Sequence, residues 1–175
     1  MQPFRLNGQE QVLYNREWSR VTANANARRA YTTGLSLGLS ADLTPSLSLT
    51  STLHYTYGRI RTDSTVHPLD HIPPLYGKTG LAVRLRRFGG EFFALYNGWK
   101  RIGDYYLNGE DNEQYATPAG MPAWYTLNCR ASVQVNAYLA LQAAVENGLD
   151  RNYRVFASGI SAPGRNVVVT IRGKF

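Results

Sequence analysis

The sequence predicts an all-β fold, an antiparallel up-and-down meander of about seven to eight long strands. Three observations lead to this prediction. Apolar and small polar residues alternate with a period of two along most of the chain. The connections between these segments are alternately short and long. Aromatic residues make up 12% of a chain in which only 18% of the residues are charged. Helical spacing never persists, and 175 residues bound the chain to one domain or to a piece of a larger one.

The clearest strands lie in the first half of the chain. Residues 34–41 alternate Gly or Ser with Leu or Ala, and residues 46–58 set mainly leucine and tyrosine at odd positions against serine, threonine and histidine at even positions. Successive residues of a strand point to opposite faces, so each of these strands has one apolar and one polar face. The same alternation defines further strands within residues 81–86, 124–136, 139–146 and 167–175.

Two further segments fit the pattern less well. Residues 91–102 contain the consecutive apolar residues Phe92, Phe93 and Ala94, which interrupt the alternation. Residues 4–14 form an optional eighth strand at the N-terminal end. The prediction is therefore seven strands, with an eighth left open.

The connections show a second regularity. Tight turns are predicted at residues 42–46, 88–90 and 136–138, which contain the residue types that turn dihedral angles favour. Long polar stretches are predicted at residues 59–75, 103–123 and 150–166. Short turns at one end and long loops at the other are typical of a transmembrane β-barrel with periplasmic turns and extracellular loops. Aromatic residues near both ends of the segments favour the same interpretation.

Alternation alone does not decide which face points outward. A soluble barrel turns its apolar face inward around an apolar ligand, whereas a membrane barrel turns that face to lipid. Segments of about 9–11 residues suit a tilted crossing of a bilayer and favour lipid as the partner. Two alternatives stay open. One is a free-standing outer-membrane barrel of eight strands with an adhesive or porin-like role, and the other is a soluble β-barrel that binds an apolar ligand.

The arginines carry most of the formal net charge of +7. On the membrane interpretation, four of them lie on polar strand faces and line the lumen: Arg84, Arg86, Arg130 and Arg172. An arginine side chain facing lipid at mid-depth would destabilise the barrel by ~2–4 kcal/mol. The positions of these arginines therefore favour an apolar face that points outward to lipid. The arginines are scattered along the chain and lie on no recognition helix, which argues against a nucleic-acid partner.

No residue pattern predicts catalysis, a cofactor or a resident metal. The chain has no Gly-x-Ser-x-Gly nucleophile elbow. His67, Asp70 and His71 have a spacing that brings ligands together on a helix, but Pro68 lies among them and argues against a helix. The single cysteine, Cys129, excludes an intrachain disulfide and a cysteine-based zinc site. We therefore expect that the chain is not an enzyme.

The long loops hold the candidate ligand contacts. Asp104, Tyr105 and Tyr106 belong to an acidic, aromatic segment, whereas Arg154 and Arg165 give the last loop a basic character. These loops could attract each other and fold over the mouth of the barrel, or their side chains could contact a ligand. Both interpretations stay open at this point.

The C-terminal third resembles a known family. Residues 146–154 read Glu-Asn-Gly-Leu-Asp-Arg-Asn-Tyr-Arg, residues 158–166 read Ser-Gly-Ile-Ser-Ala-Pro-Gly-Arg-Asn, and a strand ending in Phe175 follows. This order resembles the C-terminus of TonB-dependent outer-membrane receptors. Residues 72–77 (Ile-Pro-Pro-Leu-Tyr-Gly) and the segment that begins at Pro118 are similar to preceding barrel segments of that family.

The resemblance implies that residues 1–175 are the C-terminal segment of a receptor barrel of about 22 strands with a plug domain in its lumen. Such receptors lie in the bacterial outer membrane and import siderophore-iron, cobalamin or oligosaccharides with energy from TonB. We recognise neither a signal peptide nor a plug domain in the chain, so the implied role is passive: part of the barrel wall. The implied partners are outer-membrane lipid, the barrel assembly machinery, the plug domain and, through the plug, TonB.

The final strand also resembles the C-terminal assembly signal of outer-membrane barrels. Val167, Val169, Ile171 and Phe175 share one face, where a terminal aromatic residue would sit at the membrane interface. Arg154 and Arg165 lie inside the family-like segments, and for this reason we favour a structural role for both.

Overall fold

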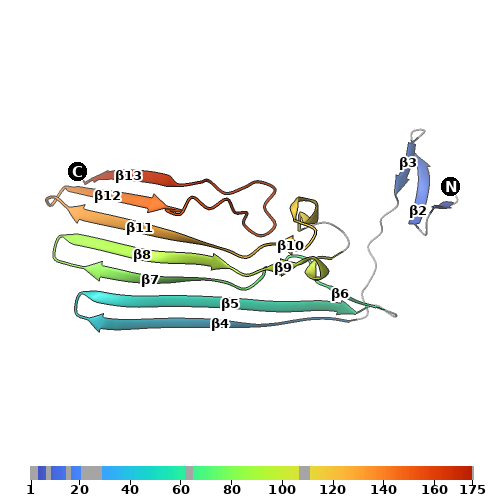
Figure 1. Ribbon diagram of the computed structural model, residues 1–175, viewed down its shortest axis with the longest axis horizontal. Helices are drawn as coiled ribbons and strands as arrows, with labels where there is room; N and C mark the ends of the chain where they lie inside the picture. The colour runs from blue at the N-terminus through green and yellow to red at the C-terminus, as the bar shows by residue number, and fades with distance from the viewer. Residues whose placement is uncertain are drawn as a thin grey trace.

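The computed structural model describes the backbone alone of residues 4–6, 9–14 and 17–20, and describes residues 29–61, 65–106 and 111–174 in full. In the described part of the chain, the predicted all-β antiparallel meander is confirmed. Seven long strands form one sheet in the order β13-β12-β11-β8-β7-β5-β4, so each long strand pairs with the long strands that precede and follow it in the chain (Figure 1).

The long strands are arranged as three hairpins and a final strand. Their bounds are Arg29–Thr44 (β4), Leu47–Arg61 (β5), Tyr76–Arg84 (β7), Phe88–Asn97 (β8), Trp124–Gln134 (β11), Leu139–Glu146 (β12) and Asn166–Gly173 (β13). The hairpin turns lie together at one end of the sheet and the long connections at the other (Figure 1). The predicted asymmetry of short turns and long loops is therefore present.

The pairing register produces two unlike faces. One row of paired residues crosses all seven strands and is apolar throughout: Ala41, Leu49, Leu81, Phe92, Cys129, Val145 and Val167. We call the side of the sheet that carries this row the apolar face. The adjacent row, on the polar face, includes Ser48, Glu91 and Arg130. On the apolar face, Phe92 is 53% exposed and Val167 is 65% exposed, so other parts of the described chain do not cover them.

Small elements occupy the loop end of the sheet. They are β6 (Val66–Pro68), β9 (Lys100–Arg101), β10 (Gly120–Met121) and the 3-10 helices η1 (Ile102–Asp104) and η2 (Glu113–Tyr115). β6 pairs with β5, and β9 pairs with β10. Several buried side chains lie in this region, among them Tyr105 and Met121, each 7% exposed.

Residues 4–14 do form strands, but they do not join the large sheet as its eighth strand. β1 (Phe4–Leu6), β2 (Gln9–Tyr14) and β3 (Glu17–Arg20) pair with one another in a separate three-stranded sheet. Segments close in sequence pair at a low loop-closure cost, which favours this local arrangement over an edge position beside β4. The eighth strand of the large sheet is β6.

The turn predicted at residues 88–90 lies earlier in the chain. The N–H of Leu85 donates to the carbonyl oxygen of Phe88 at 2.8 Å, so the residues between them form the turn. Gly89 belongs to β8, where an added Cβ would lie 2.8 Å from Ser132 Oγ on the neighbouring strand. This glycine therefore permits a close contact between strands and does not form the turn.

Candidate ligand-contact site in the loops

The last loop, between β12 and β13, is fixed at its base by Asn147. This residue has a positive φ of 49°, in the left-handed region that asparagine tolerates well. Its Nδ2 donates to the carbonyl oxygens of Arg151 (2.8 Å) and Pro163 (3.2 Å), and its Oδ1 accepts from the N–H of Arg151 at 3.0 Å. Its own N–H donates to Asn128 Oδ1 at 2.9 Å, which attaches the loop to β11.

A second set of contacts closes the same base. Asp150 Oδ1 accepts from the N–H of Arg165 at 2.8 Å, and Arg165 Nε donates to the carbonyl oxygen of Gly148 at 3.1 Å. The contacts of Arg165 are thus made within the loop. The motif that carried the family resemblance contains a set of side chains that hold the two ends of the loop together.

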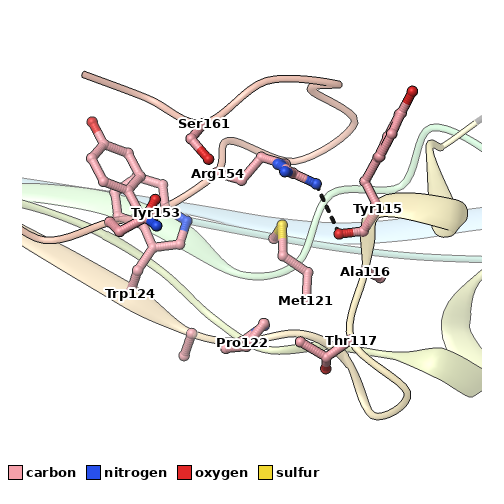
Figure 2. Close-up of a pocket in the computed structure, with 11 residues that line it drawn as sticks. Tyr115, Ala116, Thr117, Met121, Pro122, Trp124, Tyr153, Arg154 and Ser161 are labelled. Carbon is pink, nitrogen blue, oxygen red and sulfur yellow. Dashed lines mark hydrogen bonds between the residues drawn. The ribbon is translucent and has the colours of Figure 1, made fainter. Parts of the chain in front are cut away.

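The tip of this loop forms one wall of a cavity of about 240 Å³. Trp124, at the start of β11, packs against Tyr153 with 4.2 Å between ring centroids. At the other end, Arg154 Nη1 donates to the carbonyl oxygen of Tyr115 at 2.8 Å. Figure 2 shows the aromatic pair at one end and Tyr115 at the other, with Arg154 and Met121 between them. We call this cavity the loop pocket.

The electrostatics of the loop pocket favour hydrogen-bond acceptors. Its lining contains one cationic side chain, Arg154, and no acidic one. The Nε1 of Trp124 is buried and has no hydrogen-bond acceptor within the described part of the chain. Burial, and secondarily the Glu146 carboxylate, raises the pKa of Tyr153 above its ordinary value of 10.0. The phenol is therefore a neutral hydroxyl at neutral pH.

A buried lysine joins the three long loops, which are the first loop between β5 and β7, the middle loop between β8 and β11, and the last loop between β12 and β13. Lys100 is 3% exposed, and its Nζ donates to the carbonyl oxygen of Ile72 in the first loop at 2.5 Å. The ammonium also lies 5.4 Å from the ring centroid of Tyr105 and 4.8 Å from that of Phe156 in the last loop. Burial lowers the pKa of Lys100 below its ordinary value of 10.5, although the nearby Asp111 carboxylate opposes the shift.

The acidic side chains of the middle loop contact the end of β5 and the first loop. Asp104 Oδ1 accepts from Arg59 Nη2 at 2.8 Å. Asp111 Oδ1 accepts from the backbone N–H of His71 at 3.0 Å and lies 3.1 Å from its Nδ1.

The middle loop meets the last loop through carbonyl groups. Asn112 Nδ2 donates to the carbonyl oxygen of Ala157 at 2.6 Å, in addition to the contact of Arg154 with Tyr115. The loops contact one another, but within the described residues the acidic side chains of the middle loop do not pair with the basic side chains of the last loop. Lys100 and Arg154 also lie over the rings of Phe156 and Tyr115, so the two loops are joined by hydrogen bonds to carbonyl oxygens and by cation–ring contacts. That these loops cover the mouth of a barrel stays a prediction.

The five predicted ligand contacts are not brought together. Arg154 lines the loop pocket, whereas Asp104 lines a second cavity, of about 240 Å³, between the first and middle loops. Tyr105 is only 7% exposed, and Tyr106 lies edge-on to His67 with 5.8 Å between ring centroids. Arg165 is at the base of the last loop.

Sequence reasoning missed Trp124 and Tyr153 as pocket residues. Trp124 and Tyr125 are both among the aromatic residues near the long-loop ends of the predicted strands, but the register puts Trp124 opposite Asn97 on the polar face and Tyr125 opposite Tyr96 on the apolar face. The parity of Trp124 along its strand was the signal that could have separated the two.

The predicted lumen-facing arginines divide into two groups. Arg84, Arg130 and Arg172 share the polar face, paired with Gly89, Glu91 and Ala140 respectively. The assignment of Arg86 to a strand face is wrong, because β7 ends at Arg84 and Arg86 lies in the turn that follows.

Glu91 organises the centre of the polar face. Its carboxylate accepts from Lys78 Nζ at 2.5 Å and from Arg130 Nε at 3.1 Å. Both cations also lie over the ring of Phe93, at 4.2 Å and 4.8 Å from its centroid. Arg130 is therefore held by neighbours on its own sheet.

The residues of the predicted assembly signal lie on the apolar face of β13. Val167, Val169 and Ile171 are 65%, 70% and 70% exposed. Phe175 lies outside the described residues. The role of these residues in assembly remains a prediction.

The candidate metal ligands make other contacts. His67 Nε2 lies 2.7 Å from Thr65 Oγ1, and His71 contacts Asp111. Within residues 29–61, 65–106 and 111–174, no three His, Cys, Asp or Glu side chains form a group that could hold a metal ion.

Comparisons with known proteins define the fold. No protein-family model matches the chain, and no curated protein matches it. Among solved structures, the copper transporter OprC matches 83% of this chain with a TM-score of 0.70 and 20% identity. The chain spans 24% of the length of that transporter chain. The likeness shows an outer-membrane barrel fold. None of the helices in the described part of the chain has the length and hydropathy to cross a membrane.

Proposed function

We propose that the chain forms part of the wall of an outer-membrane TonB-dependent receptor that imports a scarce nutrient, such as siderophore-iron, cobalamin or an oligosaccharide. The observation that carries this proposal is the apolar row that crosses all seven long strands, from Ala41 to Val167. A face of this kind matches the hydrocarbon of a bilayer, while the opposite face lines a polar lumen.

The edges of the sheet support the same proposal. β4 and β13 are the two ends of the strand order, and within the described residues neither pairs with a further strand on its outer side. In hydrocarbon, unpaired backbone groups each cost several kcal/mol, so a sheet in a membrane must close. In the proposed receptor further strands complete the barrel, and Arg84, Arg130 and Arg172 face the plug domain.

The two alternatives have less support. A free-standing barrel of eight strands needs residues 4–14 beside β4, but these residues pair in the separate N-terminal sheet. A soluble barrel closes around its apolar face, but β4 and β13 are not paired with each other.

The cargo of OprC is not carried over to this chain. The likeness rests on 20% identity. We therefore propose import as the role, with the class of solute determined by the loops.

The single cysteine provides a direct test of the lipid-facing assignment. Cys129 is exposed at the centre of the apolar row. In outer membranes that contain the chain, we expect a lipid-soluble maleimide to label Cys129 and a charged, water-soluble maleimide to label it slowly. Brominated lipids should quench a fluorophore attached at this position.

A matched control uses the same strand. The double variant Cys129→Ser, Ser132→Cys moves the thiol to the polar face of β11. We expect the preference for the two reagents to reverse. Equal labelling of both thiols by the water-soluble reagent would contradict a lipid-facing apolar row. The intact mass of the native product in the outer-membrane fraction then separates a receptor from a small barrel, because only a receptor has a mass several-fold above 19.6 kDa.

A further inference from the structure

The loop pocket has the chemistry of a binding site for an anion. Arg154 uses Nη1 to hold the carbonyl oxygen of Tyr115. A guanidinium has five N–H donors, so several remain for a ligand. Trp124 Nε1 is buried and has no surface open to the pocket, so Arg154 is the donor available to a ligand.

The charge of the pocket limits the ligand to a monoanion. Arg154 is its one cationic lining residue, and no carboxylate lines it. A single guanidinium matches the planar, bidentate geometry of a carboxylate and balances its single negative charge. A phosphate dianion would leave a second negative charge uncompensated in a half-enclosed site.

The rest of the lining suits a flat, apolar body. The rings of Trp124 and Tyr153 are tilted by 38° to each other and form one end of the pocket. Arg154 and Met121 both lie between this pair and Tyr115 (Figure 2). The volume of about 240 Å³ lies below the range of 300–1,000 Å³ usual for drug-sized ligands, so the pocket fits a small solute or one part of a larger one.

The base of the last loop holds the site in place. Asn147 and Asp150 fix the ends of the loop through side-chain hydrogen bonds. Tyr153 and Arg154 follow directly in the chain, so their backbone positions are set before a ligand arrives. A preorganised site of this kind loses less entropy on binding than a mobile loop.

We infer that the loop pocket binds a carboxylate attached to a flat apolar or aromatic body, with Arg154 as the donor to the carboxylate and the Trp124–Tyr153 pair beside the body. This inference rests on the proposed import function, and it names the chemical class of solute that the loops recognise.

The test uses 4-fluorobenzoate as the probe. Its binding to outer-membrane vesicles that contain the chain is followed by broadening of the ¹⁹F resonance, with vesicles that lack the chain as the blank. We expect 4-fluorobenzoate to bind and its neutral analogue 4-fluorobenzamide to bind much more weakly. Arg154→Gln should reduce the affinity for 4-fluorobenzoate about 10- to 100-fold, since it removes a charged hydrogen-bond donor.

Two further variants separate recognition from loop collapse. Trp124→Phe keeps an aromatic ring beside the ligand and the charge of Arg154, so it should change the affinity by less than about twofold. Arg151→Gln changes a neighbouring arginine that contacts Tyr125 and does not line the pocket, so it should leave the affinity unchanged.

Three outcomes would overturn the inference: equal binding of 4-fluorobenzoate and 4-fluorobenzamide, equal losses for Arg151→Gln and Arg154→Gln, or no binding at all. The labelling of Cys129 in the same vesicles separates these outcomes from a failure of the proposed function. If Cys129 is lipid-facing and 4-fluorobenzoate does not bind, the wall assignment stands and the pocket inference is wrong. If Cys129 is labelled from water, the proposed function itself is wrong.

Discussion

The strand end and the loop end of this sheet are stabilised in different ways. In the strands, backbone ladders join neighbouring strands, while apolar side chains such as Leu37 (53% exposed) and Ile171 (70% exposed) have no cover in the described chain. At the loop end, Lys100 and Asp111 are each 3% exposed and are held by specific polar contacts. The loop end therefore contains its own packed centre, and the strand end does not.

The stability of the strand end and that of the loop end therefore depend on different surroundings. A two-faced sheet with exposed apolar side chains gains its stability from the medium on each side of it. The loop cluster depends on satisfied hydrogen bonds and on charges placed beside partners, which is sensitive to single side chains and less sensitive to the medium. Substitutions should therefore have different effects in the two regions.

The largest expected effect comes from a charge placed on the apolar face. Cys129→Arg puts a guanidinium in the middle of the apolar row, and in a bilayer this should cost ~2–4 kcal/mol. The measurement is the amount of chain assembled in outer membranes and its urea midpoint. Ser132→Arg, on the polar face of the same strand, is the control and should have little effect. Equal effects of the two variants would mean that the two faces of the sheet do not meet different media.

The next effect concerns the base of the last loop. Asn147→Ala removes three side-chain hydrogen bonds and puts alanine at a φ of 49°, so the loop should open more readily by about 1–3 kcal/mol. Trypsin cleavage after Arg151 and Arg154 should become about tenfold faster or more, because cleavage follows the open population. Asn152→Ala, in the exposed part of the same loop, should leave the rate unchanged. An unchanged rate in Asn147→Ala would show that the base is held by backbone contacts alone.

A smaller effect is expected for the ion pair between the end of β5 and the middle loop. The side chain of Arg59 is 19% exposed and that of Asp104 is 42% exposed, so water screens the pair. A double-mutant cycle with Arg59→Gln and Asp104→Asn should give a coupling of about 0.2–1 kcal/mol in thermal unfolding. A coupling above this range would indicate that the loop cluster shields the pair more strongly than its exposure suggests.

The smallest expected effect is a loss of stability of the folded loops at alkaline pH, when Tyr105 and Tyr153 ionise. Burial, with added repulsion from Asp111 and Glu113, raises the pKa of Tyr105 above its ordinary value of 10.0, and burial also raises the pKa of Tyr153. Below pH 10.0 these phenols are protonated in both states. As the pH rises from 10.0 through the raised pKa, the unfolded chain loses the proton first, and the folded loops lose stability.

Tyrosinate absorbance measures this titration directly. The absorbance that Tyr105→Phe or Tyr153→Phe removes should appear above pH 10.0. If the missing absorbance appears below that pH, the loop end is more hydrated than its packing indicates.

The strands were predictable from sequence because their period of two is read directly from neighbouring residues. The alternation at residues 46–58 and 124–136 was enough to assign both faces of β5 and β11. The sequence places the turn before β8 too late because Gly89 and Gly90 are typical turn residues. Both belong to β8, where Gly89 leaves room for the Ser132 side chain of the neighbouring strand.

The loop pocket was less predictable, because its residues come from separate segments of the chain. Arg154 was named from its charge, but nothing local indicates that it lies beside Tyr115, 39 residues earlier. The Lys100 cluster also depends on contacts between three loops, and no periodicity reports such contacts. Trp124 was the exception, since its parity already assigned it to the polar face.

The meander also determines the order in which contacts can form. Each long strand of the sheet pairs with the long strands before and after it, so the hairpins can add one after another without waiting for a distant segment. The bonds between Arg59 and Asp104 and between Asn112 and Ala157 each span 45 residues, so they must follow the strands that bring their loops together. We therefore expect the sheet to form first and the loop pocket to become competent last, as the final step in maturation of the chain.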